Sequence, residues 1–403
     1  IASLHPDFIS WGPFERFHTQ KFEELWREVF KNVWAQWRFE NDKPYYYGPK
    51  FTSSPIAESS STERVTLEPS EIEILNFSSG GKDSLVSLGL LQNGGVPFDT
   101  LTYSSSIYGQ AKPQHDFATN VLNTSNPTNR RQQWVFDDFL DSPILELHPE
   151  LDVKTLTAAE TPSSIFGSLP FILQHNYHYI ALGHERSANT GQVFWEKTGE
   201  DVNHQWGKSF EAEKLLNSYM HGELVANFSY FSLLQPIYDV VIFSLLNNSL
   251  EGMKNTNSCN ISTPWCEQCP KCIYVALGYH AYVPTEVPAS IFKTNMFDND
   301  DNQYTYRQLL GLESRLPFEC IGQKEEVRLA FALCCAKQLK GKALTMFQEE
   351  KIDVDRKMVL DQYLKVYDDH GMPEHIATKV LPQMTEAAER AKKLISEGLG
   401  WKQ

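Results

Sequence analysis

The feature that most constrains the fold is the segment FSSGGKDSLVSLGLL at residues 77–91. A short β-rich run, EIEILNF, leads into it. A helix-like run, DSLVSLGLLQNGG, follows the first glycines and ends at Gly94 and Gly95, which are typical of a helix C-cap. In α/β sheets, ligands bind beyond the carboxyl ends of the strands, where such a strand–turn–helix unit makes its turn. The segment therefore predicts a parallel α/β sheet with a ligand site at this turn.

The same alternation of strand and helix continues along the chain. VPFDTLTYSSS at 96–106 and HYIALGH at 178–184 are typical of strands, and SSIFGSLPFILQHN at 163–176 is typical of a helix. Strands that take turns with helices favour a parallel sheet covered by helices. The expected fold class is therefore α/β.

Three regions are expected along the sequence. Apolar residues at three- and four-residue spacing over 14–40 predict an amphipathic helix, and the Ser-, Thr-, Glu- and Pro-rich stretch 52–70 predicts a linker. We therefore expect an N-terminal helical segment and linker at 1–70, an α/β domain at 71–285, and a mostly helical region at 286–403.

Charge and cysteine usage limit the functional classes. The net charge of −15 disfavours a general nucleic-acid binder, and no apolar run approaches the ~18 residues of a membrane span. The first residues lack the basic and apolar blocks of a signal peptide. Seven cysteines, four of them within fourteen residues, suggest a reducing compartment. We expect a cytoplasmic protein; no sequence feature indicates an oligomeric state.

The glycine-rich turn has the chemistry of a phosphate-binding loop. Glycines let backbone N–H groups approach phosphate oxygens, and the following helix N-terminus adds a partial positive charge. Lys82 would add a full charge, and Ser79 and Ser84 hydroxyl groups. The turn is not a Walker A loop, because Asn76 and Asp83 stand where that motif needs Gly and Ser or Thr. The alternative is a simple glycine turn before a capped helix.

The turn resembles the SGGxDS signature of the PP-loop ATP pyrophosphatases, which have an adenine nucleotide alpha hydrolase-like fold. The matching residues are Ser79, Gly80, Gly81, Lys82, Asp83 and Ser84. The resemblance implies that ATP is cleaved between its α- and β-phosphates, that the loop holds the pyrophosphate, and that Asp83 helps to organise Mg²⁺. It also implies that the second strand end, with Tyr103 and Ser104, borders the adenine and ribose.

A later strand is followed by another polar loop, in ALGHERSANTG at 181–191. Polar groups at a strand end are candidates for a binding or catalytic site. This loop provides Gly183, His184 and Glu185 as candidates. The alternative is an ordinary solvated loop.

The segment CNISTPWCEQCPKC predicts a metal site. Cys259, Cys266, Cys269 and Cys272 can surround one tetrahedral ion, which is typical of structural Zn²⁺. An iron–sulfur cluster and a redox dithiol are the alternatives. Cys334 and Cys335 lie in an apolar helical run and are expected in the core.

An SGGxDS loop with a downstream C-x₆-C-x₂-C-x₂-C pattern resembles the 7-cyano-7-deazaguanine synthase branch of the superfamily. CPKCIYVALGYHAY, IFKTNMFDNDDN and YRQLLGLESRLPFECIGQKEEV, however, most resemble the ATP-dependent UDP-N-acetylmuramoyl-L-alanyl-L-glutamate epimerase family, over about residues 70–330. This resemblance implies that the α-carboxylate of a terminal L-glutamate in a peptide is adenylated, that the α-carbon is inverted, and that hydrolysis gives AMP and pyrophosphate. ATP, Mg²⁺ and Zn²⁺ are then the expected cofactors.

Inversion at carbon needs an acid or base on each face, or one mobile group. Cys320 in PFECIG is a candidate, because a thiolate of lowered pKa is a competent base. Glu319, Glu185 and His184 are the others, and an inert buried thiol is the alternative for Cys320. The competing functions are an amide- or nitrile-forming carboxylate adenylase, a tRNA-modifying enzyme, which the acidic charge disfavours, and a binding module without catalysis.

Overall fold

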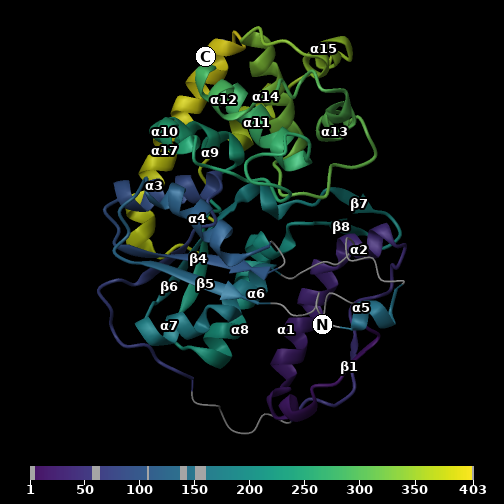
Figure 1. Ribbon diagram of the computed structural model, residues 1–403, viewed down its shortest axis with the longest axis vertical. Coiled ribbons are helices and arrows are strands. Elements are labelled where there is room, and N and C mark those ends of the chain that lie inside the picture. The colour runs from purple at the N-terminus through teal and green to yellow at the C-terminus, as the bar shows by residue number, and fades with distance from the viewer. Residues whose placement is uncertain (1–4, 57–63, 107–108, 137–142, 150–159, 402–403) are drawn as a thin grey trace.

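A five-stranded parallel sheet lies at the centre of the computed structural model, which describes residues 5–56, 64–106, 109–136, 143–149 and 160–401. The strand order is β5-β4-β3-β6-β9 (Figure 1). The strands are β3 (Ile74–Phe77), β4 (Phe98–Ser105), β5 (Arg130–Val135), β6 (Tyr179–Glu185) and β9 (Ser229–Leu234). The prediction of a parallel α/β sheet is confirmed.

Alternating strand residues supply two hydrophobic clusters, one on each face of the sheet. Ile74 and Ala181 belong to one cluster, whereas Leu75 and Ile180 belong to the other. Both faces of the sheet are therefore covered, as is usual for parallel sheets.

The chain reverses its direction of winding at β3. From β3 it moves through α3 (Lys82–Asn93) to β4 and through α4 (Ala111–Leu122) to β5. It then returns through α6 (Glu160–Gly167) and α7 (Leu169–His175) to β6, on the opposite side of β3. The carboxyl ends of β3 and β6 therefore flank a topological switch point, where open α/β sheets bind ligands.

The stretch 14–40, predicted to form an amphipathic helix, is mostly helical but interrupted. The 3₁₀ turn η2 (Gly12–Phe17), α1 (Gln20–Val33) and α2 (Ala35–Glu40) replace one continuous helix. In α1, Leu25 and Val29 pack in the same cluster as Leu75. Residues 57–63 of the predicted linker lie outside the described residues.

Short strands and helices complete this half of the molecule. β1 (Phe8–Ile9) pairs in parallel with β2 (Lys50–Phe51), and β7 (Val193–Trp195) pairs antiparallel with β8 (Glu200–Val202). Further elements are α5 (Ile144–Leu147), the 3₁₀ turns η6 (Arg186–Asn189) and η7 (Trp206–Lys208), α8 (Phe210–Tyr219) and the π-helical turn η8 (Met220–Leu224).

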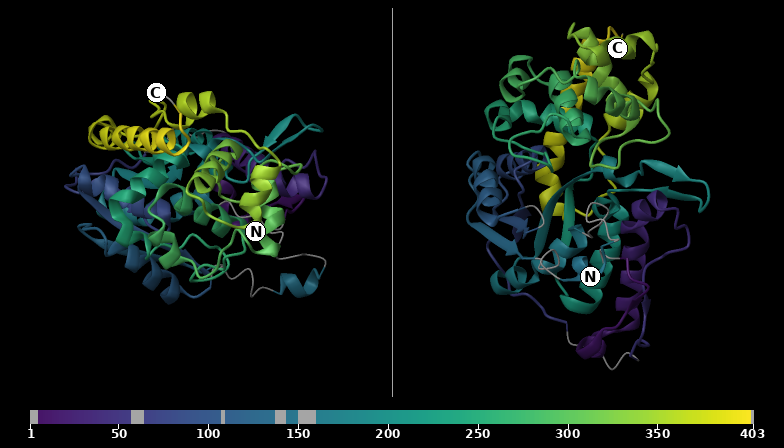
Figure 2. Two further views of the ribbon diagram at one scale, coloured as in Figure 1. Left: turned by 90° about the horizontal axis from the view of Figure 1, so that it is seen from above. Right: turned by 45° about the vertical axis from the view of Figure 1, so that its right-hand side comes forward.

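Helices dominate after β9 and gather at one end of the molecule (Figure 1). They are α9 (Asp239–Leu246), α10 (Leu250–Met253), α11 (Pro270–Tyr282), α12 (Glu286–Ile291), α13 (Gln303–Leu309), α14 (Lys324–Ala336), α15 (Lys342–Glu349), α16 (Arg356–Met358) and α17 (Glu374–Gly398). The long α17 runs from that end down to the level of the sheet and packs on α3, α9 and α14 (Figure 2). Among the described helices, none combines the length and apolar character needed to cross a bilayer.

Candidate active site

The glycine turn joins β3 to α3 and holds backbone N–H groups that have no acceptor among the described residues. Gly80 has φ +86°, and a Cβ there would lie 2.5 Å from the Phe117 ring, so glycine is required on both counts. Gly81 is the N-cap residue of α3. Its backbone is extended, and no side-chain hydrogen bond caps the helix there. Within the described part of the chain, no group accepts the N–H of Gly80 or Gly81. These donors and the helix N-terminus are suited to an anion.

Lys82 is buried beside two carboxylates. Its Nζ lies 2.5 Å from Oδ1 of Asp83 and 2.6 Å from Oδ1 of Asp239. The Tyr274 hydroxyl donates to the other oxygen of Asp239 at 2.8 Å. Burial alone would lower the pKa of Lys82, but these carboxylates outweigh it and raise the pKa. Lys82 therefore stays charged and is held by carboxylates, while the Asp83 side chain remains partly exposed.

The end of β6, which includes Gly183 and Glu185 of the predicted loop, meets the start of α3. A Cβ on Gly183 would lie 3.3 Å from the Asp83 Cβ, so the two predicted loops approach closely. Glu185 is buried. Burial raises its pKa to about 7; Lys208 opposes the shift, and Asp83 adds to it. A carboxyl group of this kind exchanges a proton near neutral pH.

The other polar residues of the stretch 184–189 differ in their contacts and exposure. His184 has a buried Nδ1 without a partner among the described residues, and burial lowers its pKa. Ser187 donates to Glu326 at 2.8 Å, and Arg186 pairs with Asp369. Asn189 is exposed at the loop end.

Tyr103 and Ser104 lie near the end of β4, beside β3. Tyr103 is half-buried and its ring stacks on Phe77, with 6.3 Å between centroids. The Ser104 hydroxyl donates to the carbonyl of Gln133 at 3.0 Å and lies 2.6 Å from His115 Nε2. The hydroxyl of Ser104 is thus bound within the protein, whereas part of the Tyr103 side chain remains exposed to solvent.

Cys320 lies in a charged cluster rather than an apolar pocket. Its sulfur, a His204 ring nitrogen and a Glu319 carboxylate oxygen lie within 4.8 Å of one another. Burial opposes ionisation of the thiol, but the charges of Lys208 and Lys271 lower its pKa, together with a hydrogen bond from His204, to about 6. The thiolate is therefore the favoured form near neutral pH.

The segment 203–209 carries His204 and Lys208 to this position. Asn203 donates to the Ala188 carbonyl at 2.8 Å, and Gln205 donates to the Ile321 carbonyl at 3.1 Å. These bonds fix the segment between the loop after β6 and the residue that follows Cys320.

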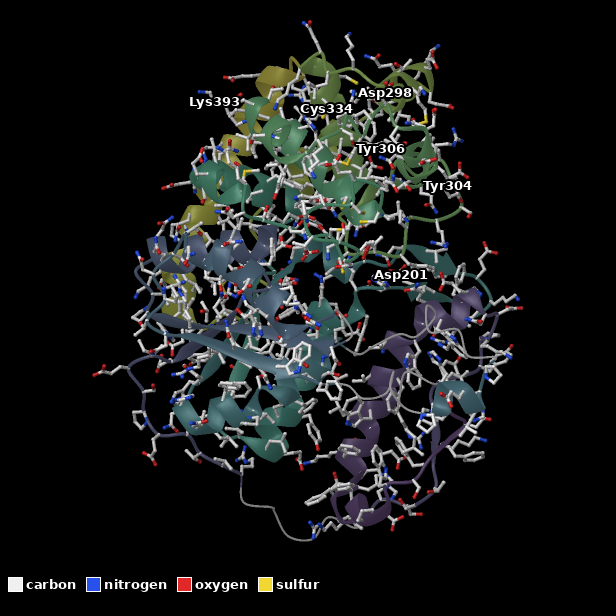
Figure 3. All side chains as sticks on the ribbon, viewed as in Figure 1. Asp201, Asp298, Tyr304, Tyr306, Cys334 and Lys393 are labelled. Carbon is white, nitrogen blue, oxygen red and sulfur yellow. The ribbon has the colours of Figure 1, made fainter. Side chains whose placement is uncertain are left out.

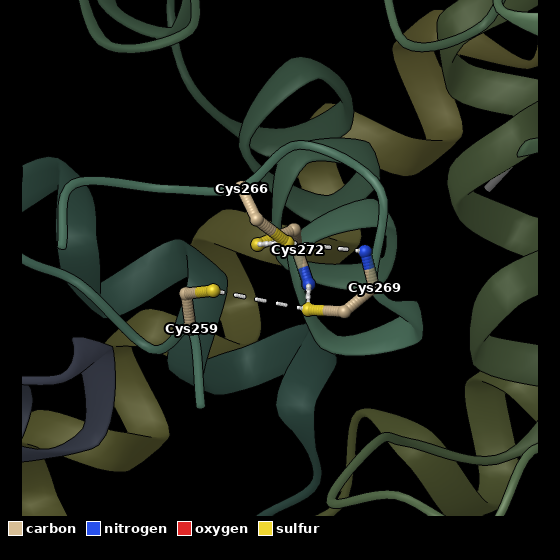
Figure 4. Close-up of side chains that lie close together, drawn as sticks. All are labelled: Cys259, Cys266, Cys269 and Cys272. Carbon is tan, nitrogen blue, oxygen red and sulfur yellow. Dashed lines mark hydrogen bonds between the residues drawn. The ribbon is translucent and has the colours of Figure 1, made fainter. Parts of the chain in front are cut away.

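The four predicted metal ligands come together. Cys259 Sγ lies 4.0 Å from Cys269 Sγ, Cys266 Sγ lies 3.7 Å from Cys272 Sγ, and all four sulfurs lie within 4.8 Å of one another (Figure 4). The four are free thiols. An ideal tetrahedron with Zn–S bonds of ~2.3 Å has sulfurs ~3.8 Å apart, so the donor set fits such an ion.

The segment 257–272 carries the four cysteines and is called the cysteine loop. It contacts both the glycine turn and Glu319. The Asn257 N–H donates to the Gly80 carbonyl at 3.1 Å. Asn260 donates to Glu319 at 3.0 Å. The loop thus lies between the glycine turn and the residue beside Cys320. Cys334 is fully buried among the helices, as expected (Figure 3), and Cys335 is partly buried.

Three residues of the site were not predicted from the sequence: Asp239, His204 and Lys208. Asp239 starts the apolar helix DVVIFSLL shortly after β9, which ends at Leu234, and this position could have marked it. His204 and Lys208 lie in NHQWGKS, where no motif points to them. Only the folded chain brings them to Cys320.

Two models of known protein domains match parts of this chain. The model of the MurL N-terminal domain matches residues 165–233, which include Glu185 and Lys208, and that of the MurL C-terminal domain matches 251–360, which include the cysteine cluster and Cys320. The glycine turn lies outside both ranges.

Curated proteins named UDP-N-acetyl-alpha-D-muramoyl-L-alanyl-L-glutamate epimerase are similar to this chain. The protein of a Micromonospora species is 28% identical over 318 residues, 76% of this chain and 66% of the relative. Those of Salinispora tropica and Xanthomonas oryzae pv. oryzae are each 30% identical, covering 63% and 64% of this chain and 54% and 56% of the relatives. The chain spans less than two thirds of the length of each relative. The domain matches and these relatives thus agree: parts of this chain are similar to the MurL domains and to proteins named UDP-N-acetyl-alpha-D-muramoyl-L-alanyl-L-glutamate epimerase.

Proposed function

We propose that this protein uses ATP to invert the α-carbon of the terminal L-glutamate of UDP-N-acetylmuramoyl-L-alanyl-L-glutamate, with release of AMP and pyrophosphate. The observation that carries the proposal is the meeting of a glycine turn, Glu185 and the Cys320 cluster at the switch point of the sheet. The names of the relatives supply the substrate and the reaction class.

The glycine turn supports the ATP half of the reaction. The N–H groups of Gly80 and Gly81, the helix N-terminus and the hydroxyl groups of Ser79 and Ser84 would hold the pyrophosphate. Lys82 fixes Asp83, whose partly exposed carboxylate would hold Mg²⁺. Mg²⁺ bound there would offset the charge of the phosphate oxygens.

The nucleoside would lie between the neighbouring strand ends. Tyr103 offers a half-exposed ring on one side. On the other side, Gly183 packs closely against Asp83 at the start of α3, and His184 carries a buried nitrogen without a partner among the described residues. The hydroxyl of Ser104 already binds the carbonyl of Gln133, so this residue would border the nucleoside rather than donate to it.

Glu185 and Cys320 support the proton-transfer half. Adenylation of the glutamate α-carboxylate gives an acyl group that withdraws electrons from the adjacent C–H bond. The Cys320 thiolate would remove the α-proton, and the Glu185 carboxylic acid would deliver a proton to the opposite face. Their pKa values of about 6 and about 7 suit proton exchange near neutral pH.

The cysteine cluster supports a structural role. A Zn²⁺ ion held by Cys259, Cys266, Cys269 and Cys272 has no open coordination position, so it would stabilise its loop. That loop contacts Gly80 and Glu319, and would thereby keep the two halves of the site in place.

The test is an assay in deuterated water with ATP, Mg²⁺ and UDP-N-acetylmuramoyl-L-alanyl-L-glutamate. We expect AMP, pyrophosphate, deuterium at the glutamate α-carbon, and D-glutamate after acid hydrolysis. AMP without deuterium would instead favour amide-forming or tRNA-modifying chemistry. Deuterium uptake without ATP would refute the adenylation step.

A pair of cysteine variants sharpens this assay. Cys320→Ser should still form AMP and lose deuterium uptake, because serine is a far weaker base. Cys335→Ser, at a partly buried position in α14, is the matched control and should keep both activities. Equal deuterium uptake by the two variants would contradict the role of Cys320.

A further inference from the structure

Lys208 is the charged group that links Glu185 and Cys320. It ends the 3₁₀ turn η7, and its positive charge lowers the pKa of the Cys320 thiol. The same ammonium group attracts the carboxylate of Glu185 and, more weakly, that of Asp83. A single cation thus lies close to both proposed proton-transfer groups.

The backbone around Lys208 is fixed by neighbours of both groups. The Lys208 N–H donates to the Gln205 carbonyl at 2.8 Å, and the Gln205 side chain donates to the Ile321 carbonyl. Two residues after Lys208, the Phe210 N–H donates to Asn189, in the turn that follows Glu185. The position of the ammonium group is therefore tied to both sides of the site.

The surroundings of Cys320 favour an ion pair over a second metal site. His204, Glu319 and Cys320 have ligand-type atoms within 4.8 Å of one another. Lys208 and Lys271, however, both place positive charge near the thiol and would repel a cation. The His204 Nδ1 lies 2.6 Å from Oε1 of the Gln36 side chain, an acceptor, so Nδ1 carries a proton and the other ring nitrogen is left for Cys320.

We propose that Lys208 is a further catalytic residue, whose ammonium group stabilises the negative charge that forms on the substrate while its α-carbon lacks a proton. This proposal rests on the proposed function. The Cys320 thiolate takes the α-proton, and the C–H electron pair moves toward the neighbouring acyl oxygen, beside which the ammonium group would lie. Glu185 then gives its proton to the other face, and exchange with water restores the thiolate and the carboxylic acid.

Other lysines near the site are less suited to this role. Lys82 is held by Asp83 and Asp239, and Lys271 lies within the cysteine loop with its ammonium group 3.4 Å from Asn260 Oδ1. Burial opposes the charged form of Lys208, but Cys320 and Glu185 outweigh it and raise its pKa. Lys208 therefore keeps its charge throughout the neutral pH range.

The first test measures the pairing of Lys208 with Cys320. The full chain is treated with iodoacetamide across a pH series, and the rate of Cys320 labelling is followed by peptide mass spectrometry. Lys208→Met should raise the pH midpoint by roughly 1 to 3 pH units, because an opposite charge is lost. Lys208→Arg should restore the wild-type midpoint to within about 0.5 pH unit, and Lys214→Met, at an exposed position in α8, should leave it unchanged.

The second test measures exchange of the hydrogen at the substrate α-carbon. With ATP, Mg²⁺ and the muramoyl dipeptide in deuterated water, Lys208→Met should still form AMP. It should lose α-deuterium uptake by roughly 100- to 1,000-fold, as when one preorganised charge-stabilising donor is removed. Lys208→Arg should recover part of that loss, and Lys214→Met should behave as wild type.

An unchanged alkylation midpoint in Lys208→Met, or deuterium uptake within about threefold of wild type, would overturn the proposal. Circular dichroism spectra and thermal midpoints of the variants identify any loss of folding, and Lys208→Arg then provides the comparison. A wild-type protein that neither cleaves ATP nor exchanges the α-hydrogen refutes the proposed function instead. The alkylation midpoint would still decide whether Lys208 pairs with Cys320.

Discussion

Removal of one partner from the ion pair between Lys82 and Asp239 is expected to destabilise the protein strongly. The N–O distance of this pair is 2.6 Å, and both side chains are almost fully buried, with 6% and 1% of their surface exposed. Removing one partner of a buried pair typically costs 3–5 kcal/mol, because the other charge stays buried without full compensation. We expect Asp239→Ala to lower the free energy of unfolding by about 3 kcal/mol, near the lower limit, since Lys82 keeps Asp83.

A surface pair of the same length provides a matched control. Lys21 and Glu223 are also 2.6 Å apart, but 53% and 20% of their side-chain surfaces are exposed. Exposed pairs contribute about 0.2–1 kcal/mol, so Glu223→Ala should change the free energy of unfolding by less than about 1 kcal/mol. Urea unfolding followed by circular dichroism measures both variants. Equal losses in Asp239→Ala and Glu223→Ala would refute the argument that burial, rather than distance, sets the contribution.

The remaining predictions concern the glycine turn, the cysteine cluster and the two proton-transfer groups. Asp83→Ala should abolish pyrophosphate release with a thermal midpoint close to wild type; unchanged turnover would remove the glycine turn from the ATP site. Metal analysis should find one Zn²⁺ per chain, which Cys269→Ser should lose; iron, or no metal in the wild type, would contradict the structural zinc site. The rate of α-deuterium uptake should be bell-shaped in pH, because Cys320 becomes a thiol below about pH 6 and Glu185 loses its proton above about pH 7. Glu185→Gln should abolish uptake without lowering AMP formation, and a variant with the wild-type profile would exclude Glu185 as the acid.

Local signals explain which parts of the fold could be predicted. The unit of β3, glycine turn and α3 is encoded in adjacent residues, so its strand, turn and helix were all found. β5, with the sequence RRQQWV, was missed because it is an edge strand without an apolar face in its sequence. β9 was also missed, because its short apolar run, SYFSLL, has no glycine turn beside it.

Long-range contacts explain which parts of the site could not be predicted. Asp239 meets Lys82 across 157 positions of sequence, and His204 and Lys208 meet Cys320 across more than one hundred. Such pairings leave no local spacing for a motif to record. The glycine turn, the loop with Glu185 and the four cysteines were found because each is a compact run of residues with recognisable chemistry.

The position of α17 against α3 has a consequence for the order of folding during synthesis. The Gln383 side chain donates to the Leu90 carbonyl at 3.0 Å, across 293 positions of sequence. While the ribosome makes the intervening residues, the apolar surface of α3 that α17 covers is open to solvent. Such exposed surface in a nascent chain invites aggregation and chaperone binding. The glycine turn is thus among the first parts of the sheet to be made, and the helix that follows it, α3, is among the last to be covered.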